Sequence, residues 1–339
     1  MGHDPKIIEL LELVVKIKDA DLPVLIEGES GTGKELVARA LHFISKRREF
    51  PLIDVNCGAI PENLMETEFF GYEKGAFTGA VNSKMGKFEA ASHGTLFLDE
   101  IEEMSLDLQV KLLRVIQWGE FTPVGGVKPK KTEARIIAAS NRDLRRLVQE
   151  GKFRHDLFYR LNVLRLEVPP LRERRQDIPV LCQHFLKRDG AKFGFPEVKI
   201  SDSALRALAS YDFPGNVREL ENLIIRAILI ANGETIQIHH FPVEISSKNS
   251  NGDLSEDVFE WPFAKAKERV VSAFEMQYVT HKLREYHGVV LQAAKSAGMF
   301  EANFRRKMEK YGIVSERVDA RKSTLNTRAE KLEYTSQKA

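Results

Sequence analysis

The chain has 339 residues, of which 43% are hydrophobic and 29% are charged, and its formal net charge is +2. This composition is typical of a soluble globular protein of about two domains, and it excludes a mainly disordered chain. The two cysteines, Cys57 and Cys182, are too few for a disulfide framework, which indicates a reducing cytoplasm. We find no signal peptide and no apolar run near the roughly 18 residues of a membrane-spanning helix.

From about residue 5 to 170, apolar strands alternate with amphipathic helices, a pattern that predicts a parallel α/β sheet. The first apolar run, 23–26, precedes a glycine-rich string and then helical spacing over 35–42. This is the context of a Walker A loop, whose backbone amides surround phosphate oxygens at a helix N-terminus. The string consists of Gly28, Glu29, Ser30, Gly31, Thr32, Gly33 and Lys34. The alternative is a glycine-rich turn that binds no nucleotide.

Lys34 is expected to reach the β- and γ-phosphates of ATP. Glu35 occupies the next position, where a hydroxyl side chain usually holds Mg²⁺, so the metal must depend on another acid. A second strand over 94–98 ends in Asp99 and Glu100, which suit Mg²⁺ binding and the polarisation of an attacking water, respectively. Without the Walker A loop, these two acids would be interpreted as a helix cap.

A third strand, predicted over 134–140, ends at Ser140 and Asn141, which can sense the γ-phosphate or simply form a turn. Farther along, Arg154 and Arg160 lie six residues apart on a short helical segment. A guanidinium group stabilises charge on a transferring phosphoryl group, although surface arginines paired with acids are the alternative. Arg218 falls in the first turn of a predicted helix and is a further candidate for contact with the nucleotide.

Between the glycine-rich string at 28–34 and the acidic pair Asp99 and Glu100 lies a small, almost chargeless segment that contains one aromatic residue. It consists of Gly75, Ala76, Phe77, Thr78, Gly79 and Ala80. A nucleotide site together with such a tip predicts an ATPase that pushes a loop against another molecule.

The expected domains are an ATPase core over 2–171, a helical lid over 172–242 and a C-terminal helical domain over 262–312. A polar linker over 243–261 and a mobile tail over 313–339 complete the chain. Predicted lid helices cover 177–187, 201–211 and 215–231, and predicted C-terminal helices cover 270–286, 292–298 and 301–311.

Residues 264–312 contain ten Lys or Arg against five Asp or Glu, a formal charge of +5 that favours DNA phosphates. The third helix would then contact DNA through Asn303, Arg305, Arg306 and Lys307. A bundle that serves only dimerisation is the alternative.

These motifs together resemble the bacterial enhancer-binding proteins, the sigma-54-dependent transcriptional activators of the AAA+ ATPase class. The resemblance covers roughly 2–242 as ATPase and 262–312 as a Fis-type helix-turn-helix, and the string over 75–80 is the hallmark of the family. It implies that Phe77 and Thr78 contact sigma-54 in the RNA polymerase holoenzyme. Glu35 after the Walker lysine is usual in this family.

The resemblance also assigns roles to residues of the ATPase. It makes Asn56 a switch that pairs with Glu100. It assigns Ser140 and Asn141 to sensor I and Arg218 to sensor II. Arg154 and Arg160 become fingers that act on the nucleotide of a neighbouring subunit. The span from Trp118 to Lys131 becomes a second surface loop.

In this family, ATP and Mg²⁺ bind between subunits of a hexameric or heptameric ring, and a helix-turn-helix binds upstream double-stranded DNA. Many members belong to two-component systems and carry an N-terminal sensor. This chain starts near the ATPase boundary, which indicates that a sensor was removed or that control acts in trans. Two other functions stay open: a AAA+ remodeller of a different protein, and a binding protein whose ATPase has decayed.

Overall fold

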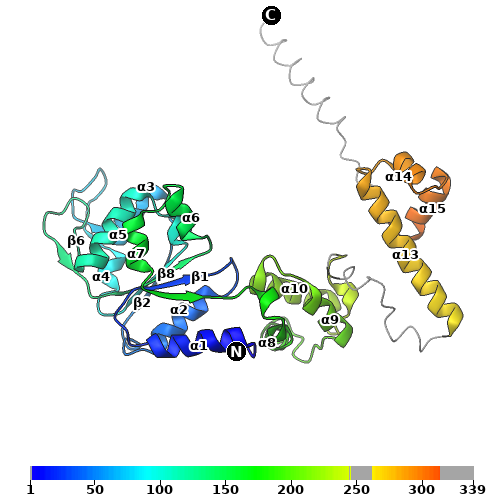
Figure 1. Cartoon of the computed structure of the whole chain (residues 1–339), viewed down its shortest axis with the longest axis horizontal. Helices are drawn as coiled ribbons and strands as arrows, with labels where there is room; N and C mark the ends of the chain where they lie inside the picture. The colour runs from blue at the N-terminus through cyan, green and yellow to red at the C-terminus, as the bar shows by residue number, and fades with distance from the viewer. Residues whose placement is uncertain (1, 244, 246–261, 314–339) are drawn as a thin grey trace, which may run out of the picture. The chain divides into compact units, whose positions relative to one another are not determined.

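The computed structural model describes residues 2–243, 245 and 262–313 (Figure 1). The chain divides into two compact units, 1–251 and 252–339. Most of the predicted linker and all but the first residue of the predicted tail lie outside the described residues.

A five-stranded parallel sheet forms the centre of the first unit, with the strand order β2-β5-β8-β1-β9. Its strands are β1 (Val24–Glu27), β2 (Leu52–Asn56), β5 (Thr95–Asp99), β8 (Arg135–Ser140) and β9 (Leu164–Glu167). Every residue of β8 is buried, as expected for an inner strand covered on both faces. The predicted parallel α/β sheet is confirmed.

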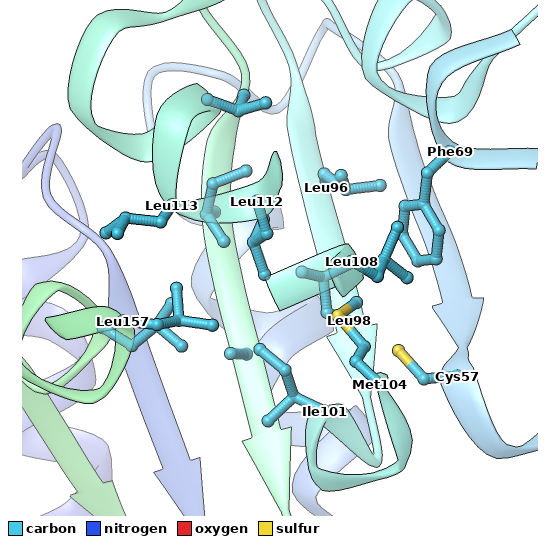
Figure 2. Close-up of a cluster of buried hydrophobic side chains, with 14 of the residues drawn as sticks. Cys57, Phe69, Leu96, Leu98, Ile101, Met104, Leu108, Leu112, Leu113 and Leu157 are labelled. Atoms are coloured by element: carbon cyan, nitrogen blue, oxygen red, sulfur yellow. The ribbon is translucent and has the colours of Figure 1, made fainter. Parts of the chain in front are cut away.

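Successive residues of each strand face opposite layers of helices. On β5, Leu96 and Leu98 join the cluster formed with α3 (Glu62–Phe70), α4 (Lys87–Ala90), α5 (Leu106–Trp118), α6 (Leu144–Gln149) and α7 (His155–Leu161). Phe97 points the other way, toward α1 (Pro5–Ile17) and α2 (Lys34–Phe43). Figure 1 shows α1 and α2 on one face of the sheet, and Figure 2 shows Leu96 and Leu98 packed against Leu108 and Leu112 of α5.

Two short hairpins extend from the α/β layer. One pairs β3 (Gly71–Tyr72) with β4 (Lys84–Met85), and the other pairs β6 (Glu120–Phe121) with β7 (Lys130–Lys131). Two 3₁₀ turns follow strand ends: η1 (Cys57–Ala59) after β2 and η2 (Ile101–Glu103) after β5. These turns lie at the carboxyl edge of the sheet, where parallel α/β folds place their ligands.

The rest of the first unit is helical, with its own core of side chains such as Leu208, Ile224 and Ile228. It contains η3 (Leu171–Glu173), η4 (Arg175–Asp177), α8 (Ile178–Lys192), α9 (Asp202–Ser210), α10 (Asn216–Ala231) and η5 (Ile238–His240). Helix α8 continues beyond the predicted end at 187. Gly190 fits inside it because the chain returns so closely that a Cβ there would lie 2.7 Å from the Phe195 carbonyl oxygen.

The described part of the second unit consists of α13 (Phe263–Glu285), α14 (Val290–Ser296) and α15 (Glu301–Lys310). These helices pack around Val279, Leu283 and Phe304. Helix α13 begins at Phe263, not near 270 as predicted. Its first two turns are rich in Ala, Lys and Glu, which are good helix formers. These turns lack the apolar periodicity on which the sequence prediction relied.

Candidate nucleotide site

The glycine-rich string forms the turn between β1 and α2. Gly28, Gly31 and Gly33 all have positive φ, at 156°, 76° and 102°, which explains the need for glycine there. Lys34 is 7% exposed, and its Nζ donates to the carbonyl oxygens of Gly28 at 2.7 Å and Glu29 at 3.1 Å. Burial lowers the pKa of Lys34, while the charges of nearby carboxylates oppose that effect.

Asp99 and Glu100 stand at the carboxyl end of β5, close enough to Lys34 to act on its charge. The Glu100 amide donates to Asp99 Oδ1 at 3.0 Å, and Glu100 itself has a left-handed backbone, with φ of 54°. Burial raises the pKa of the Asp99 carboxyl, and the neighbouring Lys34 ammonium partly offsets this. A non-glycine residue in this conformation at a strand end is the type of strain that accompanies functional sites.

Asn56 and Glu100 approach the same glycine. A Cβ on Gly58 would lie 2.5 Å from Glu100 Oε2 and 3.4 Å from Asn56 Oδ1. Asn56 Oδ1 accepts a hydrogen bond from the Ala59 amide at 3.0 Å, and among the described residues no hydrogen bond joins Asn56 to Glu100. The switch pairing therefore stays a prediction.

Asn141 follows β8 at the same edge, because β8 and β5 are adjacent and parallel. Its backbone amide donates to Glu102 Oε1 at 3.1 Å. Ser140 Oγ accepts from the Arg142 amide at 3.1 Å and donates to the Arg142 carbonyl at 2.8 Å. Glu102 was not predicted from the sequence, since nothing in the run from Asp99 to Glu103 shows which acid is buried.

The helical part of the first unit binds the glycine-rich turn through α10. Asn216 is fully buried, with φ of 54°, and its Nδ2 donates to Glu29 Oε2 at 3.1 Å and to the Ser30 carbonyl at 3.0 Å. Its Oδ1 accepts from the Leu171 amide at 2.8 Å. Arg218 Nη1 donates to Ser30 Oγ at 3.3 Å, so this predicted residue does lie at the turn.

Two further arginines from the same region reach the turn. Arg172 forms a bidentate pair with Glu29 at 2.6 and 2.8 Å, which lowers the pKa of the Glu29 carboxyl. Arg174 is buried and donates from Nη2 to the Thr32 carbonyl at 2.7 Å. Neither was predicted, although the basic run that begins at Arg172, on the predicted domain boundary, was a signal. Glu35, by contrast, is exposed and pairs with Arg39 at 2.8 Å, one turn along α2.

Arg154 and Arg160 lie apart from this cluster, and among the described residues no hydrogen bond or ion pair connects them to it. Arg154 occupies the N-cap position of α7 without a side-chain capping bond, and its guanidinium donates to Asp156 at 2.7 and 3.0 Å. Arg160 is exposed, and no acid in the described ranges forms an ion pair with it. The alternative of paired surface arginines thus describes Arg154 but not Arg160.

The predicted tip is carried by the β3–β4 hairpin. Phe77 is 46% exposed and packs its ring edge-on against Tyr72, with centroids 5.0 Å apart. Thr78 is exposed. Gly75 and Gly79 have positive φ, and a Cβ added to either glycine would have no other atom within 4 Å. The structure therefore presents an open tip with one aromatic side chain and one hydroxyl.

The second hairpin lies against the first. The Glu73 amide donates to the Val124 carbonyl at 3.0 Å, and the Val124 amide donates to the Gly71 carbonyl at 2.9 Å. Gly125 contacts Ala76 so closely that a Cβ there would lie 2.6 Å from the Ala76 Cβ. Val127, near the end of this second loop, is 93% exposed.

In the C-terminal unit, the predicted DNA-contacting residues differ in their availability. Asn303 and Arg306 are exposed on α15. Arg305 pairs with Glu301 at 2.7 Å, and Lys307 pairs with Glu275 at 2.6 Å. The structure thus leaves Arg306 as the basic residue of the four that is exposed without an ion pair among the described residues.

Both cysteines are buried and unpaired. Burial raises the pKa of each thiol, that of Cys182 to about 12. In the described part of the chain, no cluster of His, Cys, Asp and Glu has the makeup of a metal centre, and no helix there is long and apolar enough to cross a bilayer.

Residues 1–167 match the family model of the sigma-54 interaction domain, and residues 172–257 match that of the AAA+ ATPase lid domain. The regulatory protein AtoC of Escherichia coli (strain K12) is 42% identical over 314 residues, which are 92% of this chain and 68% of AtoC. NtrC of Azospirillum brasilense is 51% identical over 246 residues, which are 73% of this chain and 51% of NtrC.

Among solved structures, NtrX from Brucella abortus has a TM-score of 0.70 at 34% identity and covers 92% of this chain and 69% of its own. The same protein in complex with ATP has a TM-score of 0.68 at 33% identity, with the same coverage. The chain spans about half the length of several curated relatives that it matches, for example 57%, 51% and 46%. The chain belongs to the sigma-54-dependent transcriptional activators, with a sigma-54 interaction domain of the AAA+ class followed by its helical lid.

Proposed function

We propose that this chain is a cytoplasmic ATPase that activates transcription by remodelling the closed promoter complex of sigma-54 RNA polymerase. The observation that carries the proposal is an exposed tip, residues 75–80, on the same α/β layer as a glycine-rich turn with a buried lysine. The ATP complex of the relative NtrX supports nucleotide binding at this turn.

In this proposal, the residues of the turn, with Glu35 behind it, surround the phosphates, and Lys34 exchanges its backbone acceptors for phosphate oxygens. Glu100 polarises the attacking water, and Asn141 contacts the terminal phosphate. Asp99 is a carboxylate at the strand end beside Lys34, which suits a Mg²⁺ ion that enters with ATP. That ion would neutralise charge on the phosphates.

The completed site requires a second copy of the chain. Arg160 is exposed and free of an ion pair among the described residues, as an arginine that reaches a neighbour's phosphate must be. Arg154 can contribute only after it leaves Asp156. We therefore propose that hydrolysis occurs in a ring, and that the rate per chain rises with chain concentration. A specific ATPase rate that is constant on dilution contradicts this.

The geometry also suggests how hydrolysis reaches the tip. Asn56 and Glu100 meet at Gly58, and the chain runs from there through α3 directly into β3, the first strand of the hairpin. A change in the Glu100 contact on release of the terminal phosphate would shift η1 and α3, and with them the loop. This is an order switch driven by the phosphate.

We further propose that α15 binds upstream double-stranded DNA through Asn303 and Arg306, with Arg305 and Lys307 contributing when their acidic partners release them. Dimerisation through this unit alone is the competing function. A remodeller of a different protein is the competing function for the ATPase.

The test is a pull-down of sigma-54 by the chain in ADP and aluminium fluoride, which imitates the transferring phosphoryl group. We expect complex formation only with that mimic present. Thr78→Ala should keep ATPase activity but lose both this complex and promoter opening. Thr280→Ala, which removes a hydroxyl that donates to the Met276 carbonyl one turn earlier in α13, is the matched control. Loss of ATPase activity together with remodelling in Thr78→Ala would show that the tip is a structural part of the nucleotide site.

A further inference from the structure

Glu102 is a buried acid that the mechanism above does not use. Its side chain is 8% exposed, and it lies in η2, two residues after Glu100. Its Oε1 accepts the Asn141 amide hydrogen at 3.1 Å, while its Oε2 is buried without a hydrogen-bonding partner among the described residues. A buried carboxyl with one unpaired oxygen costs stability, so its presence requires an explanation.

The position of this bond relative to the sheet supplies one. The ladder between β5 and β8 ends at the pair Leu98 and Ala138. Beyond that pair, β5 leads into Glu100 and β8 leads into Asn141. Ser140 and Arg142 bond to each other, and Arg142 Nη2 also pairs with Glu103 Oε1 of η2 at 3.0 Å. That pair is exposed to solvent and contributes little, whereas the bond between Glu102 and the Asn141 amide involves a buried carboxylate.

We propose that Glu102 is a positioning residue of the ATPase: by accepting the Asn141 amide hydrogen, it holds the sensor at the end of β8 against the turn that carries Glu100. The inference rests on the proposed ATPase function. This buried bond, together with the exposed Arg142–Glu103 pair, keeps a fixed separation between the strand ends that bear the sensor and the water-activating acid. The sub-ångström placement of such groups controls the rate of the chemical step more than the affinity for substrate.

Three substitutions separate the role of the acceptor oxygen from that of the charge. Glu102→Gln keeps an oxygen within reach of Asn141 but removes the charge. Glu102→Asp keeps the charge but is one methylene too short, and Glu102→Ala removes both. We expect Gln to retain at least about half of the wild-type kcat, and Asp and Ala to lose roughly tenfold, with KM for ATP unchanged within about twofold. Glu150→Ala, at a surface acid on the C-terminal side of α6, is the control.

Amide hydrogen exchange of the full chain gives a second measurement that does not depend on turnover. Protection of the segment 139–143 should persist in the Gln variant and fall in the Asp and Ala variants, whether or not the chain hydrolyses ATP. A wild-type chain without ATPase activity would refute the proposed function while leaving this exchange result to decide the positioning role.

The inference is overturned if Asp performs like wild type while Gln performs like Ala, because charge would then be the relevant property. It is equally overturned if Ala leaves both kcat and the exchange of 139–143 unchanged. If Ala does not fold, the comparison of Gln with Asp decides the question alone.

Discussion

Removal of the Asn216 side chain tests how firmly α10 is joined to the glycine-rich turn. The side chain is fully buried and makes three hydrogen bonds, to the Leu171 amide, to Glu29 and to the Ser30 carbonyl. At about 0.5–1.5 kcal/mol for each bond, Asn216→Gly should lower the free energy of unfolding by about 2–4 kcal/mol. Asn216→Ala should cost about 1–2 kcal/mol more, because its φ of 54° suits glycine and disfavours alanine.

Asn232 offers a matched control at the other end of the same helix. It is also left-handed, with φ of 47°, but it is exposed. Asn232→Gly should change the free energy of unfolding by less than about 0.5 kcal/mol, and Asn232→Ala should show the conformational cost alone. The difference between the two glycine variants isolates the hydrogen bonds.

Urea unfolding followed by far-UV circular dichroism supplies the free energies, and limited proteolysis near Leu171 reports local release of the junction. The reasoning is refuted if Asn216→Gly destabilises the chain no more than Asn232→Gly does. The same holds if proteolysis near Leu171 is equally slow in both variants.

Three further outcomes are expected. Gly31→Ala should lower the free energy of unfolding in urea more than Gly151→Ala does. Both positions have φ near 70°, but only a methyl group at Gly31 collides with the Gly215 carbonyl. Equal losses of stability in the two variants would contradict the collision. Burial lowers the pKa of His42 below 6.5, so the unfolded chain binds more protons at this residue than the folded chain, and the stability present above pH 6.5 should be lost as pH falls. His42→Gln should flatten the dependence of the free energy of unfolding on pH in this range. An unchanged dependence would show that His42 is not its cause. Arg306→Ala should weaken DNA binding and reduce the slope of log affinity against log salt by about 1, whereas an unchanged slope would show no phosphate contact.

The nucleotide-binding turn and the sheet were predictable because their signals are local. A buried strand, three glycines with positive φ and a helix follow one another within about twenty residues, and each constrains the same short segment. The strand ends at Asp99 and Asn141 were predictable for a similar reason, since parallel strands bring their carboxyl ends to one edge.

Contacts made across long sequence separations could not be predicted. Asn216 meets Ser30 from 186 residues away and Arg172 meets Glu29 from 143, and neither sequence segment indicates its partner. Glu102 stands among four acids in five residues, and only the fold determines which of them is buried. The roles of Asn56, Arg154 and Arg160 depend on nucleotide and neighbouring chains, so they stay predictions.

The burial of both thiols makes this chain suitable for site-specific labelling. Maleimide dyes react with exposed thiolates, and neither Cys57 nor Cys182 offers one. A cysteine introduced as Val127→Cys, at a 93% exposed position, would therefore take the dye without removal of either native residue. Since that loop shares backbone hydrogen bonds with the β3–β4 hairpin, the fluorophore would follow displacement of the tip in real time.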